Sequence, residues 1–101
     1  MHSFHPLQVV EVISRELEFR GINRSHLGMY FEELGGKLQT SAFPFVYQGD
    51  GWIGEIISED ELEFTKVFTV NAVKIRFTAE TELKLDDLIK QYRYKTTRVG
   101  G

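Results

Sequence analysis

The feature that most constrains the fold is a long stretch of two-residue alternation in the second half of the chain. Apolar residues recur at alternate positions in two runs, first Leu62, Phe64, Phe68 and Val70, then Val73, Ile75 and Phe77. This is the period of half-buried strands, whose successive side chains point to opposite faces of a sheet. The sequence predicts strands over residues 62–70 and 73–78, joined by a turn at residues 71–72, with Lys66 interrupting the first apolar run.

More strands precede this stretch. Residues 43–48 and 52–58 are rich in aromatic and β-branched side chains, and Gly49-Asp50-Gly51 between them reads as a hairpin turn. The acidic run at residues 59–61 is expected at a solvated strand end. Consecutive strands with such short links predict an antiparallel meander. Near the start, residues 15–20 alternate charged and apolar side chains and predict one further strand. In residues 7–13, Val9, Val10 and Ile13 also fit helical spacing, but three β-branched side chains favour an extended conformation.

Two amphipathic stripes predict helices. Asn23 or Ser25 can cap the first helix, and Gly35-Gly36 ends it. The second helix is predicted over residues 80–95. The apolar stripes have the i, i+3, i+4, i+7 spacing of one helix face, and they consist of Leu27, Tyr30, Phe31 and Leu34 in the first helix and Leu85, Leu88, Ile89 and Tyr92 in the second.

These elements predict one α+β domain over residues 1–101, an antiparallel sheet with two helices on one face in the order β-α-β4-α. Residues 1–13 are expected to form an extension and residues 96–101 a flexible tail. Hydrophobic residues make up 42% of the chain and charged residues 27%, which is the composition of a globular domain. One-sided alternation in the strands leaves the second sheet face to water or a partner.

Composition narrows the partners. The net charge of −3 and a pI near 5.6 lack the basic surface that nucleic acid requires. No apolar run is long enough to span a bilayer, and the chain has no cysteine, which fits a reducing compartment. We expect a cytoplasmic protein that binds neither nucleic acid nor membrane.

No residue pattern predicts catalysis. His2 and His5 form an H-x-x-H pair, but a zinc site needs about four ligands, so no metal is expected. Carboxylates cluster at residues 32–33, 59–61 and 86–87, in charged surroundings typical of solvated faces. Nucleophile motifs are absent, and Gly49-x-Gly51-x-x-Gly54 lacks the lysine of a phosphate loop. The sequence predicts a protein that is not an enzyme and uses no cofactor.

Aromatic residues indicate where a partner could bind. Tyr47 and Trp52 flank the Gly-Asp-Gly turn and would anchor a binding surface if they lay on the open sheet face. A different hypothesis is a ligand pocket between the sheet and the last helix, lined by Phe64, Phe68, Phe77 and Tyr92, although core packing is the more frequent fate of such side chains.

The chain ends in Gly100-Gly101. Ubiquitin-like sulfur carriers end in two glycines, because an activating enzyme must thread the tail and adenylate the last carboxylate. Those carriers open with a β-hairpin before their helix, whereas here a helix is predicted after the first strand. A sulfur or acyl carrier acting through Gly101 is therefore the alternative hypothesis for function.

Three segments, in this order and spacing, carry a family resemblance: Tyr30-Phe31-Glu32-Glu33-Leu34-Gly35-Gly36, Val73-Lys74-Ile75-Arg76-Phe77 and the closing Gly100-Gly101. With them, residues 14–101 resemble the C-terminal domain family of bacterial MoaD-related proteins, whose function is unknown. The resemblance implies a TATA-binding-protein-like fold of β-α-β4-α order. Family members can follow a ubiquitin-like MoaD domain, which implies a link to molybdopterin cofactor biosynthesis.

Together these observations predict a non-catalytic binding or accessory module linked to molybdopterin cofactor biosynthesis. We expect it to bind a protein partner, which could be a second copy of the chain. The partner would dock on an apolar or mixed patch of the uncovered sheet face.

Overall fold

Seven elements follow one another in residues 12–100, the part of the chain that the computed structural model describes. They are β1 (Ile13–Arg20), α1 (Arg24–Glu33), β2 (Lys37–Leu38), β3 (Phe45–Gly49), β4 (Trp52–Thr65), β5 (Phe68–Ala79) and α2 (Glu82–Gly100). The strands form one sheet in the order β1-β5-β4-β3-β2, with every neighbouring pair antiparallel. The predicted α+β class, with an antiparallel sheet and two helices, is confirmed.

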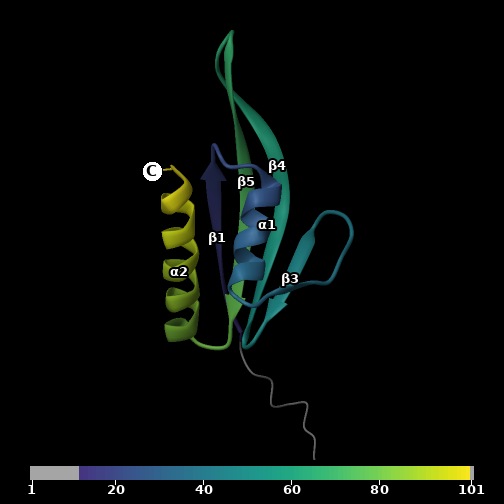
Figure 1. Ribbon diagram of the computed structural model, residues 1–101, viewed down its shortest axis with the longest axis vertical. Helices are drawn as coiled ribbons and strands as arrows, with labels where there is room; N and C mark the ends of the chain where they lie inside the picture. The colour runs from purple at the N-terminus through teal and green to yellow at the C-terminus, as the bar shows by residue number, and fades with distance from the viewer. Residues whose placement is uncertain (1–11, 101) are drawn as a thin grey trace, which may run out of the picture.

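Both helices pack on the same face of the sheet (Figure 1). The ring of Phe31 in α1 lies 4.4 Å from the ring of Tyr92 in α2, measured between centroids. Phe77 of β5 contacts both rings, at 5.7 and 5.1 Å. This aromatic cluster is completely buried and joins the two helices to the centre of the sheet, where apolar burial contributes most to stability.

The ends of the helices follow from local hydrogen bonds. The Asn23 side chain accepts a bond from the His26 amide at 2.9 Å, so Asn23 is the N-cap of α1. After α1, Gly35 adopts a positive φ of 97°, which glycine tolerates without strain. At the start of α2, the Thr81 hydroxyl accepts a bond from the Lys84 amide at 3.1 Å. The predicted α2 stripe is buried against the sheet at Leu85, Leu88, Ile89 and Tyr92.

Two predicted strand boundaries are wrong. β4 continues through the acidic run to Thr65, and β5 passes through Asn71 and Ala72 without a turn; the chain reverses at residues 66–67 instead. The sequence does not predict the short β2. The number of strands after α1 still agrees with the prediction, because this missing strand offsets the one strand too many that is predicted over residues 52–78. The step from Val70 to Val73 breaks the two-residue alternation. It marks a change in which sheet face is apolar rather than a turn.

α2 also extends beyond its predicted end at residue 95. Thr96 and Thr97 donate hydroxyl hydrogen bonds to the carbonyls of Arg93 and Tyr94, three residues back, and so remain compatible with the helix. The flexibility predicted for residues 96–101 concerns motion and stays a prediction. Of the predicted strand over residues 7–13, only Ile13 is in a described element; residues 1–11 lie outside the described residues.

Candidate protein-docking surface

Tyr47 and Trp52 do not lie on the open sheet face. Tyr47 is buried and its ring stacks on Phe31 at 5.4 Å; Trp52 is half-buried and stacks on the same ring at 5.6 Å. Burial raises the pKa of the Tyr47 hydroxyl, and the nearby Glu32 carboxylate adds to this. Tyr47 is therefore a core residue rather than an exposed anchor, and Trp52 supports the core from the hairpin at the sheet end.

The β4–β5 hairpin projects from the rest of the molecule as a two-stranded ribbon (Figure 1). β1 pairs with β5 only as far as Ala72, and β3 pairs with β4 only from Trp52 to Ile56. We call residues 61–71 the arm, because no other strand within residues 12–100 pairs with them, and the remaining described residues the body. Both edges of the arm present backbone groups without a strand neighbour, which is the usual situation in which a sheet accepts another chain.

One face of the arm is apolar. Leu62 is paired with Val70, so the two side chains share a face, and Phe68 follows on the same side of β5. Phe64 lies at a bulge, with its ring centroid 5.8 Å from that of Phe68. Both residues are 52% exposed. We call Leu62, Phe64, Phe68 and Val70 the arm face.

The arm face continues the uncovered side of the sheet. The core residues Val73, Ile75 and Phe77 point to the helices, and the alternation along β5 changes phase between Val70 and Val73. The opposite side of the arm carries Glu61 and Glu63, in line with Glu59 near the helices. The arm is thus a ribbon with one apolar and one acidic side.

Hydrogen bonds fix the base of the arm to the body. The Asn71 side chain donates to the Ile22 carbonyl at 2.7 Å and to the Glu59 carboxylate at 3.0 Å. The same carboxylate accepts the Arg24 amide at 3.2 Å, and the Gly21 amide donates to the Asn71 carbonyl at 3.0 Å. These bonds tie β5 at Asn71 and β4 at Glu59 to the loop before α1 and to the first residue of α1, and so fix the base of the arm.

The uncovered face of the body is polar at its centre. Arg76 of β5 donates to Glu16 of β1 at 2.8 Å and lies 3.6 Å from Glu55 of β4. The hydrogen bond to Glu16 raises the pKa of Arg76. Ser14 and Thr78 form a further cross-strand hydrogen bond of 2.8 Å. Val46 and Ile53 add apolar side chains to this face toward β3, and the arm face is the apolar part that projects beyond the body.

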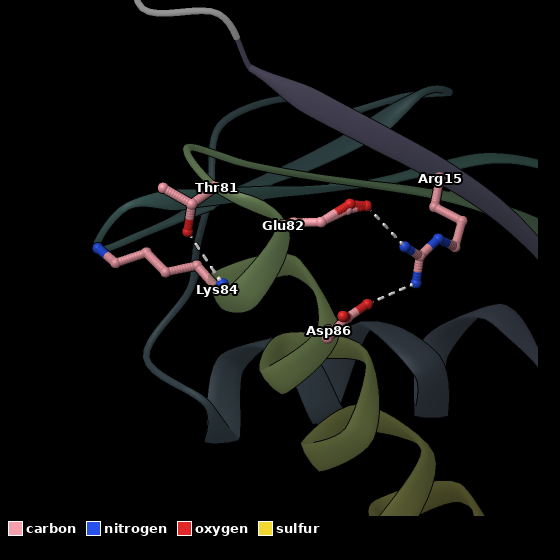
Figure 2. Close-up of polar contacts among 5 residues, drawn as sticks. All are labelled: Arg15, Thr81, Glu82, Lys84 and Asp86. Atoms are coloured by element: carbon pink, nitrogen blue, oxygen red, sulfur yellow. Dashed lines mark hydrogen bonds and ion pairs between the residues drawn. The ribbon is translucent and has the colours of Figure 1, made fainter.

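Ion pairs also link β1 to α2 (Figure 2). Arg15 reaches Asp86 at 2.9 Å and Glu82 at 3.4 Å, from the helix-covered side of the sheet. All three side chains are exposed, and pairs of this kind contribute about 0–1 kcal/mol to stability. The predicted solvated carboxylates at residues 32–33, 59–61 and 86–87 are exposed as expected.

Two shallow hollows lie on either side of Trp52. The larger, of about 230 Å³, is lined by the ends of β3, β4 and β5, and the smaller, of about 160 Å³, lies between Trp52 and α2. The pocket predicted from four aromatic residues does not form: Phe77 and Tyr92 are buried in the core, whereas Phe64 and Phe68 lie on the arm.

The residues that the structure describes contain no cluster of three metal-ligating side chains; His2 and His5 lie outside them.

Gly100 is the last residue of α2, and Gly101 lies outside the described residues. Among the helices described, none is long and apolar enough to cross a membrane.

With this geometry in place, comparison with protein families gives a match over nearly the whole chain. Residues 15–101 match the family described as archaeal MoaD-like protein. The chain belongs to this family. The curated proteins give no match. The MoaD-related part of the predicted resemblance is confirmed, and its assignment to a bacterial C-terminal domain family stays a prediction.

The sequence contained a signal for the arm face. The alternation predicts that Leu62, Phe64, Phe68 and Val70 share a face, and it predicts a turn where the phase changes before Val73. A strand that continues through such a change presents its two apolar runs to opposite faces of the sheet. Because two helices cover one face, the other run is exposed.

Proposed function

We propose that this MoaD-like protein is a non-catalytic protein-binding module that serves molybdopterin cofactor biosynthesis in the cytoplasm. The arm face is its docking surface. The observation that carries the proposal is the exposure of Phe64 and Phe68 on a projecting ribbon with a fixed base. Large aromatic side chains are the residues that most often dominate the binding energy of protein interfaces.

The chemistry of the surface favours binding over catalysis. Arg76 lies among carboxylates on the uncovered side of the sheet, and Arg15 lies among carboxylates on the helix-covered side. Both are engaged in exposed ion pairs. The arm carries Glu61 and Glu63 on its second side, which disfavours nucleic acid as a partner. The proposal includes a TATA-binding-protein-like arrangement of the fold. The acidic side of the arm disfavours nucleic acid as a partner in that fold as well. The link to molybdopterin rests on the family alone, since fold does not fix function.

The test is affinity capture from the native host with the tagged chain as bait. Three baits are compared: the wild-type chain, a double variant Phe64→Ser/Phe68→Ser, and the control Phe43→Ser. Phe43 is also half-exposed, at 48%, but lies in the loop before β3. We expect proteins of molybdopterin biosynthesis to be captured by the wild type and the control and to be lost from the arm variant. Equal capture by all three baits would contradict the arm face as the docking surface.

A carrier that acts through Gly101 is the second candidate. The family match that extends to residue 101, and so includes Gly100-Gly101, favours it. Because α2 continues to Gly100, an activating enzyme would have to unwind the last helical turn to reach the carboxylate. The intact mass of the protein from its native host tests this candidate. A mass raised by the difference between a sulfur and an oxygen atom would establish a thiocarboxylate, and an unmodified mass in cells that are making the cofactor would oppose it.

A further inference from the structure

The outer edge of β4 is free along the arm. β3 pairs with β4 only as far as Ile56, and beyond this residue no strand within residues 12–100 pairs with that side of β4. Residues 58–63 pair with β5 in one uninterrupted register, between irregularities at Ile56/Ser58 and Glu63/Thr65. They form a regular strand whose outward backbone N–H and C=O groups have no strand neighbour, so a further extended chain can pair with them.

The outer edge of β5 is less open. β1 pairs with β5 as far as Ala72, and the Gly21 amide just after β1 donates to the Asn71 carbonyl at 3.0 Å. The Asn71 side chain donates to the Ile22 carbonyl. Beyond these bonds β5 offers residues 68–70, fewer than the roughly five or six residues of an ordinary strand. A strand that adds to the arm therefore adds at the edge of β4.

The helix side of the β4 edge is acidic. It carries three exposed glutamates, which are Glu59, Glu61 and Glu63. Their partners in β5 are uncharged, and are Val73, Asn71 and Thr69. Glu59 already accepts hydrogen bonds from the base of the arm. Within residues 12–100 no ion pair involves Glu61 or Glu63, so both carboxylates are open to a partner.

The basic residues around the arm lie at its base and at its tip. On the helix side of the base, the Arg24 guanidinium lies over the Phe45 ring, 4.3 Å from its centroid. The others lie near Asp60 on the uncovered side or in the turn at the tip, and are Arg20, Lys74 and Lys66. Glu61 and Glu63 lie between base and tip, where the helix side keeps its negative charge.

We infer that the β4 edge of the arm binds an extended segment of a partner protein in which lysine or arginine alternates with apolar residues. The segment adds as a further strand through backbone hydrogen bonds to residues 58–63. Its alternate side chains point to opposite faces. The basic ones lie beside Glu61 and Glu63, and the apolar ones extend the arm face next to Leu62. This inference rests on the proposed function and deepens it, because it names the chemistry of the partner.

The same charges select against a second copy of the chain. In a two-fold antiparallel pairing of two β4 edges, residues on the same side of the sheet are opposite each other. The helix-side positions 59, 61 and 63 are all glutamate, so every register that overlaps them places carboxylates opposite each other. Like charges directly opposite destabilise a strand pair, whereas a basic strand replaces this repulsion with attraction.

Binding of synthetic peptides to the purified full chain tests the inference. The probe is a peptide of about eight residues with lysine at alternate positions and valine or phenylalanine between them. The control peptide has glutamate in place of each lysine. Fluorescence anisotropy of the labelled peptides measures binding. We expect saturable binding of the lysine peptide with a Kd below about 1 mM, and binding of the glutamate peptide at least about tenfold weaker.

Charge reversal in the protein locates the site. Glu61→Lys/Glu63→Lys should weaken binding of the lysine peptide at least about fivefold and strengthen binding of the glutamate peptide. The control Asp50→Lys/Asp87→Lys changes the net charge by the same amount at exposed positions of the body. It should leave both affinities within about twofold of the wild type, because salt screens distant charges. Equal losses in the two variants would overturn the inference, since the attraction would then not be located at the β4 edge.

Backbone methylation of the peptide tests strand addition itself. Alternate residues of an added strand direct their N–H groups toward β4, and the residues between them direct theirs away. N-methylation of one alternate set of amides should therefore abolish binding, whereas N-methylation of the other set should leave the Kd within about threefold. Equal effects of the two sets would show that the peptide is held by charge without pairing, and would overturn the inference.

Absence of lysine-peptide binding up to about 1 mM also overturns the inference. Failure of the proposed function is distinguishable from this. A chain that binds no peptide, but loses its captured proteins in the Phe64→Ser/Phe68→Ser variant, would dock partners through the arm face alone and leave the proposed function intact. A chain that binds the lysine peptide at the β4 edge, but captures the same proteins with and without Phe64 and Phe68, would support the present inference alone.

Discussion

The body and the arm are built from the same two strands, yet the alternating apolar residues of β4 and β5 have opposite fates in them. In the body, Ile56, Ile75 and Phe77 are completely buried beneath the two helices. In the arm, Phe64 and Phe68 are half-exposed on a ribbon that no helix covers. Alternation therefore specifies that a strand has an apolar face, and the neighbouring elements decide whether that face becomes core or surface.

The two regions also differ in how they are held. The body is stabilised by an aromatic cluster that bridges both helices and the sheet. The arm is held at its base by polar bonds from Asn71, and further out by the pairing of its two strands alone. Two-stranded ribbons are marginally stable in isolation. We expect apolar substitutions to act on stability in the body and on association in the arm.

Truncating the centre of the body should give the largest effect. Phe31→Ala removes a fully buried ring that contacts Tyr47, Trp52, Phe77 and Tyr92. We expect a loss of about 3–5 kcal/mol in the free energy of unfolding, measured by chemical denaturation. The matched substitution Phe68→Ala in the arm should cost less than about 1 kcal/mol. Similar losses at both positions would erase the distinction between body and arm.

Alkaline pH should act on the body. Burial, followed by the neighbouring Tyr47 and Tyr30, raises the pKa of the Tyr92 hydroxyl far above its ordinary value, and this hydroxyl donates to the Leu27 carbonyl at 2.6 Å. An unfolded tyrosine ionises near pH 10, so the stabilising contribution is complete below pH 10. Above it, the unfolded state loses a proton that the folded state keeps, and stability falls by about 1.4 kcal/mol per pH unit for this group.

Denaturation monitored by circular dichroism between pH 8 and about pH 11 checks this dependence. The variant Tyr92→Phe lacks the ionisable group, so its stability should fall less steeply with pH even though it loses the bond to Leu27. An equal slope in the variant and the wild type would mean that other groups determine the alkaline transition.

The contrast between the two regions also explains how much the sequence could predict. The helix stripes ending at Leu34 and Tyr92, and the capping position at Asn23, were predictable, because capping and i, i+4 spacing are local properties. The two-residue β2 has too few residues to show a period. The sequence does not predict the turn at residues 66–67. Lys66 has the pattern of a single interruption in an apolar run, and Asn71-Ala72 has the pattern of a turn.

The candidate surface was only partly accessible to sequence reasoning. The shared face of Leu62, Phe64, Phe68 and Val70 was visible in the alternation, but its exposure depends on where β1, β3 and the helices end. Tyr47 and Trp52 are predicted anchors because they flank the Gly-Asp-Gly turn. Their burial depends on Phe31, a contact distant in sequence that no local pattern encodes.

Loosening the base should affect the arm more than the body. Asn71→Ala removes the bonds to the Ile22 carbonyl and to Glu59. Because the bond to Ile22 is part-buried and the bond to Glu59 is exposed, we expect a loss of about 1–2 kcal/mol in the free energy of unfolding. Hydrogen exchange of the backbone amides should show faster exchange in residues 61–71 and unchanged protection in α2. Faster exchange throughout the chain would mean that arm and body unfold as one unit.

The smallest effect is expected where polar contacts lie entirely on the surface of the body. Arg15→Ala removes the ion pairs to Asp86 and Glu82 (Figure 2). All three side chains are exposed, and water screens their attraction, so we expect a loss of less than about 1 kcal/mol that decreases further with added salt. Denaturation at low and high salt measures it. A loss as large as that of Asn71→Ala would show that ion pairs hold β1 to α2 as firmly as hydrogen bonds hold the arm to the body. The two regions would then differ in whether helices cover the sheet, and polar bonds would be equally important for holding both in place.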